Sequence, residues 1–146
     1  MRIGNGAVSK GIAEALNSRT DSFKKQLTKV SYVLPSNLTV LEYLDRKGRS
    51  PYADWFDSLN PEAAAKIVIA ITRMGQGNLS SVKSVGSGVF ECKVDFGPGY
   101  RIYLGKDGDS IIILLGGGTK KRQQRDINDA VAKWQDYKKR KVPRVQ

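Results

Sequence analysis

The chain has 146 residues, 40% hydrophobic and 27% charged, with a formal net charge of +11. These values indicate one globular domain, and no apolar run approaches the roughly 18 residues that a membrane span requires. The absence of histidine excludes serine–histidine and cysteine–histidine hydrolases, so we expect neither a metal site nor a cofactor. The single cysteine, Cys92, excludes an internal disulfide, suits a reducing cytoplasm and is expected to be buried in a strand.

Residues 1–36 are predicted to form an N-terminal extension. Apolar residues recur in it at a spacing typical of one or two amphipathic helices. Pro35 and Ser36 then interrupt this pattern. No motif in the extension can be tied to a chemistry, so we assign it no function and treat residues 37–146 as the main domain.

The next segment is predicted to be a strand followed by two helices. Residues 38–44 are rich in β-branched and aromatic side chains, which favours a strand. Ser50 and Pro51 are typical of a helix start, and Asn60 and Pro61 repeat the same signal for a longer helix. The very short link between the helices predicts an antiparallel helical hairpin.

The middle of the chain is predicted to be a loop and three strands. The Ser/Gly/Val-rich residues 78–88 form the loop. Alternating apolar residues predict a strand over 89–96, and a turn at 97–99 leads into its partner over 100–104. The continuous apolar run 111–115 predicts a central strand covered on both faces.

The C-terminal segment begins with three glycines, 116–118, which we interpret as a flexible hinge, followed by a basic run over 120–125. Residues 116–146 hold ten Lys/Arg against three Asp/Glu, whereas residues 37–115 hold nine of each. This asymmetry favours binding to phosphate backbones or to an acidic protein partner. A last helix is predicted over about 122–141, with Trp134 and Tyr137 in an aromatic stripe that packs on the core while Lys133 points away from it.

This order of elements predicts an α+β domain. Hairpin connections make its sheet of about four strands antiparallel. Pairing across the 97–99 turn brings Glu91 and Lys93 near Arg101 and Tyr103 on one face of the sheet. Because the two helices can cover only one side of so small a sheet, we expect this polar face to be open to solvent.

Such a surface has two interpretations. Guanidinium groups bind phosphate bidentately and stabilise charge that develops at phosphorus, so the face could support metal-independent cleavage of RNA by its own 2′-hydroxyl. Four of its side chains could then transfer the proton, namely Glu91, Lys93, Tyr103 and Asp126. Alternatively, the charged groups form an exposed cross-strand ladder that contributes little.

Several motifs of the chain are similar to those of one protein family and occur in the same order. They are Arg49-Ser50-Pro51 with Trp55-Phe56, Gly77-Asn78-Leu79, the run from Phe96 to Tyr103, and Gly116 to Lys120 with Gln123 and Asp126-Ile127. Over about residues 38–140 the chain resembles the RelE/ParE-superfamily toxins of bacterial toxin–antitoxin modules. The closest branch in this resemblance is the HigB-like one, often labelled addiction-module killer proteins.

The resemblance implies a small RelE-like fold with an antiparallel sheet, an N-terminal helical hairpin and a C-terminal helix. It implies an mRNA interferase that cuts mRNA in the ribosomal A site without a metal and is silenced by a cognate antitoxin. That partner would be a HigA-like helix-turn-helix protein, and operator DNA would be contacted only through it. The superfamily also includes ParE-like gyrase inhibitors, so a gyrase inhibitor and an inactive antitoxin-binding module remain alternatives.

The resemblance also implies roles for particular residues. Arg101 matches the strand arginine that contacts the scissile phosphate, and Lys93 matches a strand lysine that contacts RNA. With Tyr103 and Lys120 they make up the expected catalytic set. The general base is unassigned, because this chain lacks the histidines that some HigB members use. The expected RNA-binding residues are Lys121, Arg122, Gln123 and Arg125.

Overall fold

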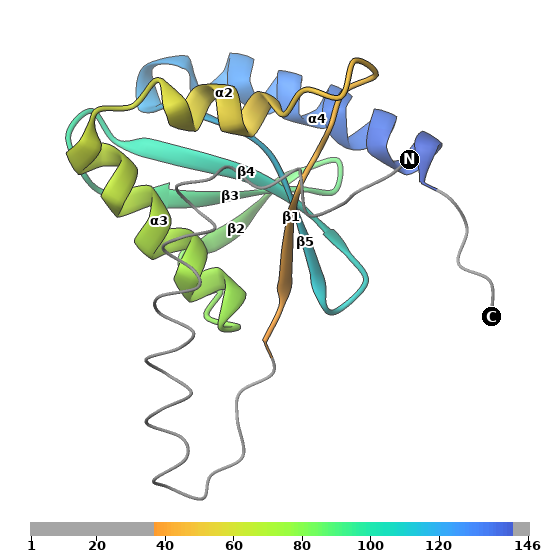
Figure 1. The fold of residues 1–146 in the computed structure, drawn as a ribbon, viewed down its shortest axis with the longest axis horizontal. Coiled ribbons are helices and arrows are strands. Elements are labelled where there is room, and N and C mark those ends of the chain that lie inside the picture. Colours follow the sequence, from red (N-terminus) through yellow and green to blue (C-terminus); the bar gives the residue numbers. More distant parts are fainter. Residues whose placement is uncertain (1–36, 142–146) are drawn as a thin grey trace, which may run out of the picture.

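The computed structural model describes residues 37–141, so the helices expected in the N-terminal extension lie outside the described residues. Figure 1 shows a sheet with helices against it. The elements follow in the order β1 (Thr39–Glu42), α2 (Pro51–Asp57), α3 (Pro61–Gly75), β2 (Val82–Gly86), β3 (Val89–Val94), β4 (Tyr100–Asp107), β5 (Ile111–Thr119), a short 3-10 helix (Lys120–Arg122) and α4 (Gln123–Arg140). The predicted α+β class is therefore confirmed.

The sheet is mixed and has five strands in the order β1-β5-β4-β3-β2. Strands β2 to β5 pair antiparallel through successive hairpins, whereas β1 pairs parallel with β5. The expected sheet of about four antiparallel strands therefore needs correction on two counts. In the sequence, β1 and β5 are separated by two helices and three strands instead of a short hairpin turn, so no local feature determines their relative direction.

The additional strand is β2, within the segment interpreted as a loop. Its residues are mostly polar and exposed, with only Val82 and Val85 partly buried. At the edge of the sheet, β2 is held by backbone pairing to β3, and that pairing requires no apolar run. Positive φ angles at Gly86, Ser87 and Gly88 close the turn between the two strands.

Helices α2 and α3 begin at the predicted residues. The Ser50 side chain accepts a hydrogen bond from the Ala53 amide at 3.0 Å, and the Asn60 side chain accepts one from the Ala63 amide at 2.9 Å. These caps satisfy amides that have no partner within the helix. The expected antiparallel hairpin is not confirmed, because Figure 1 shows α2 and α3 meeting at an angle instead of running alongside each other.

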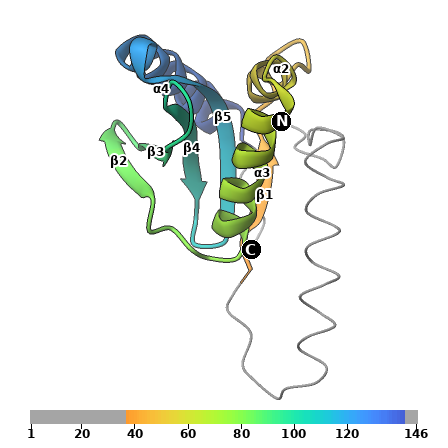
Figure 2. The same ribbon diagram turned by 90° about the vertical axis from the view of Figure 1, so that its left-hand side faces the viewer.

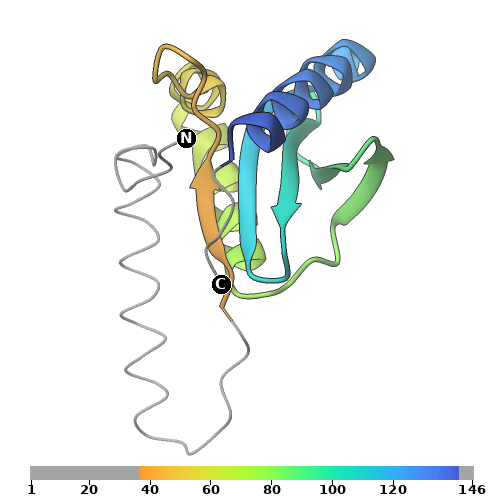
Figure 3. The ribbon, with the colours of Figure 1, turned by 90° about the vertical axis from the view of Figure 1, so that its right-hand side faces the viewer.

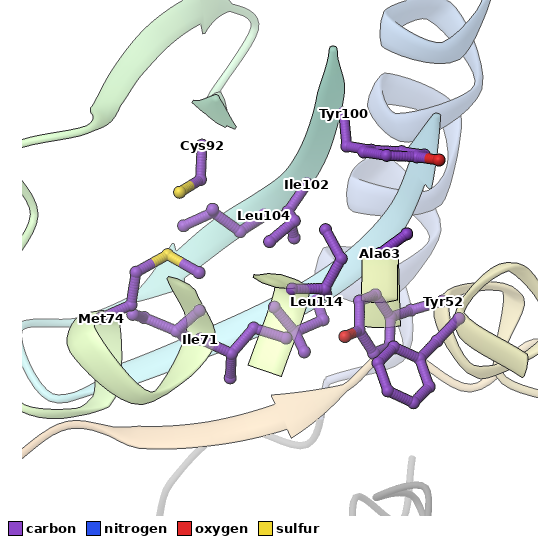
Figure 4. Packing of buried hydrophobic residues seen from close by; sticks show 12 residues of the cluster. Tyr52, Ala63, Ile71, Met74, Cys92, Tyr100, Ile102, Leu104 and Leu114 are labelled. Atoms are coloured by element: carbon purple, nitrogen blue, oxygen red, sulfur yellow. The ribbon is translucent and has the colours of Figure 1, made fainter. Parts of the chain in front are cut away.

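Helix α3 covers one face of the sheet and α4 covers the other, as Figure 2 shows with the strands between them. The face of α3 that packs on the sheet includes Ile67, Ile71 and Met74. Figure 4 shows part of this core, in which Cys92 is 2% exposed, as expected of a buried strand residue. Burial and the nearby Glu91 raise the pKa of the Cys92 thiol to about 11, so the thiol stays protonated.

The second core lies beneath α4. Ala130, Trp134 and Tyr137 of this helix are buried against the sheet, so the predicted aromatic stripe does pack on the core. Figure 3 shows α4 lying across one end of the strands. The face expected to be open to solvent is therefore covered, and that expectation is wrong. None of the helices within residues 37–141 combines the length and the hydrophobicity that a membrane-spanning helix requires.

Candidate functional site

The strand register places the two predicted cationic strand residues side by side. Lys93 of β3 is opposite Arg101 of β4, which is opposite Gly118 of β5. The neighbouring row on the same face holds Glu91 and Tyr103. Residues directly opposite each other project to the same side of a sheet. All of these side chains therefore point toward the layer that contains α4.

Arg101 lies inside the protein, not on its surface. It is 5% exposed, and its Nε donates a hydrogen bond of 2.6 Å to Oε1 of the fully buried Glu91. Gln123, at the start of α4, donates from its amide nitrogen to both Glu91 oxygens, at 3.2 and 3.0 Å. The interpretation as an exposed ladder is therefore wrong, because the first turn of α4 closes over a buried ion pair.

The glycines before the basic run have a packing role. Residues 116–118 belong to β5, so the interpretation as a flexible hinge is wrong. A Cβ on Gly117 would collide with the ring of Trp55, and a Cβ on Gly118 would collide with the Asp126 carboxylate. Their lack of a side chain lets Trp55 approach the sheet from one side and Asp126 approach it from the other, next to Arg101.

Three buried polar atoms at this place have no hydrogen-bond partner within the part of the chain that the structure describes. They are Nη1 of Arg101, the hydroxyl of Tyr103 and Oδ2 of Asp126. A buried donor or acceptor without a partner costs about 1–3 kcal/mol, so such groups mark places where a polar ligand atom would be stabilised. We call Glu91, Arg101, Tyr103, Gln123 and Asp126 the polar cluster.

Burial changes the proton affinity of two members of the polar cluster. Burial, with the negative charges of Glu91 and Asp126 nearby, raises the pKa of the Tyr103 phenol. Burial also raises the pKa of the Asp126 carboxyl, although the cation of Arg122 opposes this effect. An acid held above its usual pKa in a polar pocket is suited to proton transfer near neutral pH.

Cations form a rim around the polar cluster. The Lys93 side chain is 53% exposed and lies 3.4 Å from an Asp95 oxygen, a surface ion pair that contributes little. The Lys120 amide donates to the Gly99 carbonyl at 2.9 Å, which attaches the basic run to the turn before Arg101. The predicted RNA-binding cations are exposed around this position, namely Lys121, Arg122 and Arg125, whereas Gln123 is partly buried.

Lys133 also belongs to this neighbourhood, although its position in the helical pattern predicted that it would point away from the sheet. A Cβ on Gly116 would lie 3.4 Å from the Lys133 Nζ, so this side chain lies over β5. Burial lowers the pKa of Lys133, while Asp129 and Asp126 oppose that effect. The signal was present in the sequence: Lys133 follows Asp126 by seven residues, which is two helical turns and therefore the same face of α4.

Comparison with known proteins places the chain in a family without defining its activity. No known family model matches the chain. A protein of Haemophilus influenzae (strain ATCC 51907 / DSM 11121 / KW20 / Rd) is 42% identical over 80 residues, which cover 54% of this chain and 81% of that protein. The chain therefore belongs to the same family as this relative, whose description is "Uncharacterized protein".

Proposed function

We propose that the protein is the toxin of a type II toxin–antitoxin module, in the HigB-like branch of the RelE/ParE superfamily. In this proposal it cuts mRNA on the ribosome without a metal ion, and a cognate helix-turn-helix antitoxin neutralises it and alone contacts operator DNA. The observation that carries the proposal is the row formed by Lys93 and Arg101 beside the exposed Lys120. Clustered cations beside unpaired buried polar atoms suit the stabilisation of a phosphorane.

The architecture supports the same proposal. Two helices precede the hairpins of an α+β sheet, and a helix follows the last strand. We assign this arrangement to the RelE-like fold, in which the sheet carries the reactive residues and the C-terminal helix borders them. The cationic rim provides a surface for ribosomal RNA and for the acidic or amphipathic segment of an antitoxin.

The chemistry follows from the polar cluster. The 2′-hydroxyl of a nucleotide attacks the adjacent phosphorus, the bond to the 5′-oxygen breaks, and the products are a 2′,3′-cyclic phosphate and a free 5′-hydroxyl. Arg101 Nη1 and the Lys93 amine donate to the phosphate oxygens as negative charge develops. Asp126, with its raised pKa, accepts the proton of the 2′-hydroxyl, and the departing 5′-oxygen takes up a proton from solvent. The Tyr103 phenol donates a hydrogen bond to a phosphate oxygen.

Access to Arg101 requires a local movement. Because Arg101 is 5% exposed, a phosphate reaches Nη1 only after the first turn of α4 moves away from the sheet. Two hydrogen bonds from Gln123 to Glu91 hold that turn in place. Two hydrogen bonds to a charged carboxylate contribute about 3–6 kcal/mol, and binding to the ribosome supplies this free energy.

The proposal is tested by expression in cells that lack the antitoxin. Lys93→Gln removes an exposed cation and leaves the fold intact, so we expect restored growth and about a 10²-fold loss of mRNA cleavage. Lys83→Gln, an exposed lysine on the edge strand β2, is the matched control and should stay toxic. Cleavage is measured by primer extension on ribosome-bound mRNA.

Two results would contradict the nuclease. If wild-type expression stops growth while mRNA stays intact and DNA breaks accumulate, the protein is a gyrase inhibitor. If the wild type is harmless but binds the product of the adjacent gene tightly, it is an inactive antitoxin-binding module.

A further inference from the structure

A cleft of about 360 Å³ opens on the face of the sheet that carries α3, opposite the face that holds the polar cluster. Its walls are α3 on one side and the end of β3 on the other, and the segment that joins α3 to β2 closes one end. Its polar lining consists mainly of Lys66, Arg73, Asn78, Ser80, Ser81 and Lys93. A volume of this size, at the lower end of the ~300–1,000 Å³ range of ligand sites, accommodates a sugar–phosphate unit.

The cleft is cationic. Lys66 and Arg73 are seven residues apart on α3, so they project from the same face of that helix. Within residues 37–141, neither forms a salt bridge, and the Lys66 Nζ lies 5.6 Å from the centre of the Phe96 ring. The one carboxylate of the lining, Asp95, is 82% exposed and can turn into solvent away from Lys93.

The cleft is also preformed. The backbone amide of Asn78 donates a hydrogen bond of 2.9 Å to the Arg73 carbonyl, which attaches the loop to the end of α3. The Asn78 side chain accepts hydrogen bonds from the Ser80 amide at 3.1 Å and from the Ser80 hydroxyl at 2.8 Å. On the other side, the Lys93 amide donates to the Ser81 carbonyl at 3.3 Å. Both ends of the loop are thus fixed before any ligand arrives, which lowers the entropy cost of binding.

The thiol that lines the cleft carries no charge that would repel an anion. The floor includes Cys92, whose thiol has a pKa raised to about 11 and is therefore neutral at physiological pH. Arginine binds phosphate oxygens in a bidentate manner, lysine adds a compact charge, and serine hydroxyls donate further hydrogen bonds. The lining therefore has the composition of a phosphate site.

We propose that this cleft binds a backbone phosphate of single-stranded RNA and extends the RNA path from the cationic rim around the edge of the sheet. Lys93 connects the two regions, because its backbone borders the cleft, where its amide donates to the Ser81 carbonyl, while its side chain points to the face that carries Arg101. The identity of the ligand as RNA rests on the proposed function, whereas the affinity for phosphate rests on the cleft alone. The nucleotide whose phosphate enters the cleft lies several nucleotides along the RNA from the one that is cut.

The test is an NMR titration of the ¹⁵N-labelled full chain, first with inorganic phosphate and then with a five-nucleotide single-stranded RNA. We expect both probes to shift the amide signals of Asn78, Ser80, Ser81 and Lys93, and the RNA to bind more tightly. In Lys66→Gln/Arg73→Gln the affinity for RNA should fall about 10-fold, and the slope of log affinity against log salt should become shallower by about 0.7, as the loss of one phosphate contact on a single strand predicts.

The matched control is Lys83→Gln/Lys138→Gln, which removes the same charge from exposed positions outside the cleft. An equal loss of affinity in the control would overturn the proposal, because the effect would then reflect net charge. Shifts confined to residues 99–101 and 118–126 would also overturn it, and binding of phosphate without RNA would refute RNA as the ligand. If the cleft binds RNA but wild-type protein leaves ribosome-bound mRNA intact, the proposed nuclease fails and the cleft assignment stands.

Discussion

Replacing Glu91 by glutamine tests how firmly the buried ion pair holds α4 to the sheet. The side chains of Glu91 and Arg101 are 0% and 7% exposed, and 2.6 Å separates the joined atoms. The substitution keeps the shape of the side chain but leaves the guanidinium without a counter-charge. Breaking a buried pair in this way costs about 3–5 kcal/mol, far more than the ~0–1 kcal/mol of a surface pair.

The assay is urea denaturation monitored by tryptophan fluorescence, combined with a double-mutant cycle. We expect Glu91→Gln and Arg101→Met each to lower the free energy of unfolding by about 3–5 kcal/mol. The double variant Glu91→Gln/Arg101→Met removes both charges, so it should cost less than the sum of the single losses by about 2 kcal/mol or more. A loss below ~1 kcal/mol for Glu91→Gln would refute this reasoning, because water would then reach the pair as it reaches a surface ion pair.

Two further predictions concern the surroundings of this pair. Gly118→Ala would force Asp126 and the first turn of α4 away from β5, so we expect the free energy of unfolding to fall by about 1–3 kcal/mol in urea denaturation. Gly116→Ala is the control, because its Cβ would meet only the flexible end of Lys133, and its free energy of unfolding should fall clearly less. Equal losses in the two variants would contradict the packing role of Gly118. The pKa of Asp126 is higher in the folded protein than in the unfolded chain. At a pH above both pKa values the charged carboxylate therefore destabilises the fold, and this cost disappears as the pH falls below the pKa of the unfolded chain. Asp126→Asn should therefore stabilise the fold at pH 7 but not at pH 3, and should abolish mRNA cleavage; a variant that is destabilised at pH 7 would contradict the burial of that charge.

Local signals in the sequence were sufficient to predict most of the helices and strands. Ser50 and Asn60 cap helices where predicted, because capping depends on only a few adjacent residues. The alternation after Val89 and the turn at 97–99 determined the β3–β4 hairpin and its register, since turn position and period together leave little freedom. That register places Lys93 next to Arg101, so the sequence alone determined which residues share one face of the sheet.

Only the tertiary structure decided which face is covered. Helix α4 packs across the polar face, where a Cβ on Gly105 would collide with the ring of Trp134, and no local pattern specifies such a fit. Strand β2 exists because β3 offers it backbone partners, and β1 runs parallel because long connections leave direction to packing. Arg101 is buried for the same reason: the sequence places it on a strand beside Glu91, and Gln123, far along the sequence, donates a hydrogen bond to the same Glu91 carboxylate.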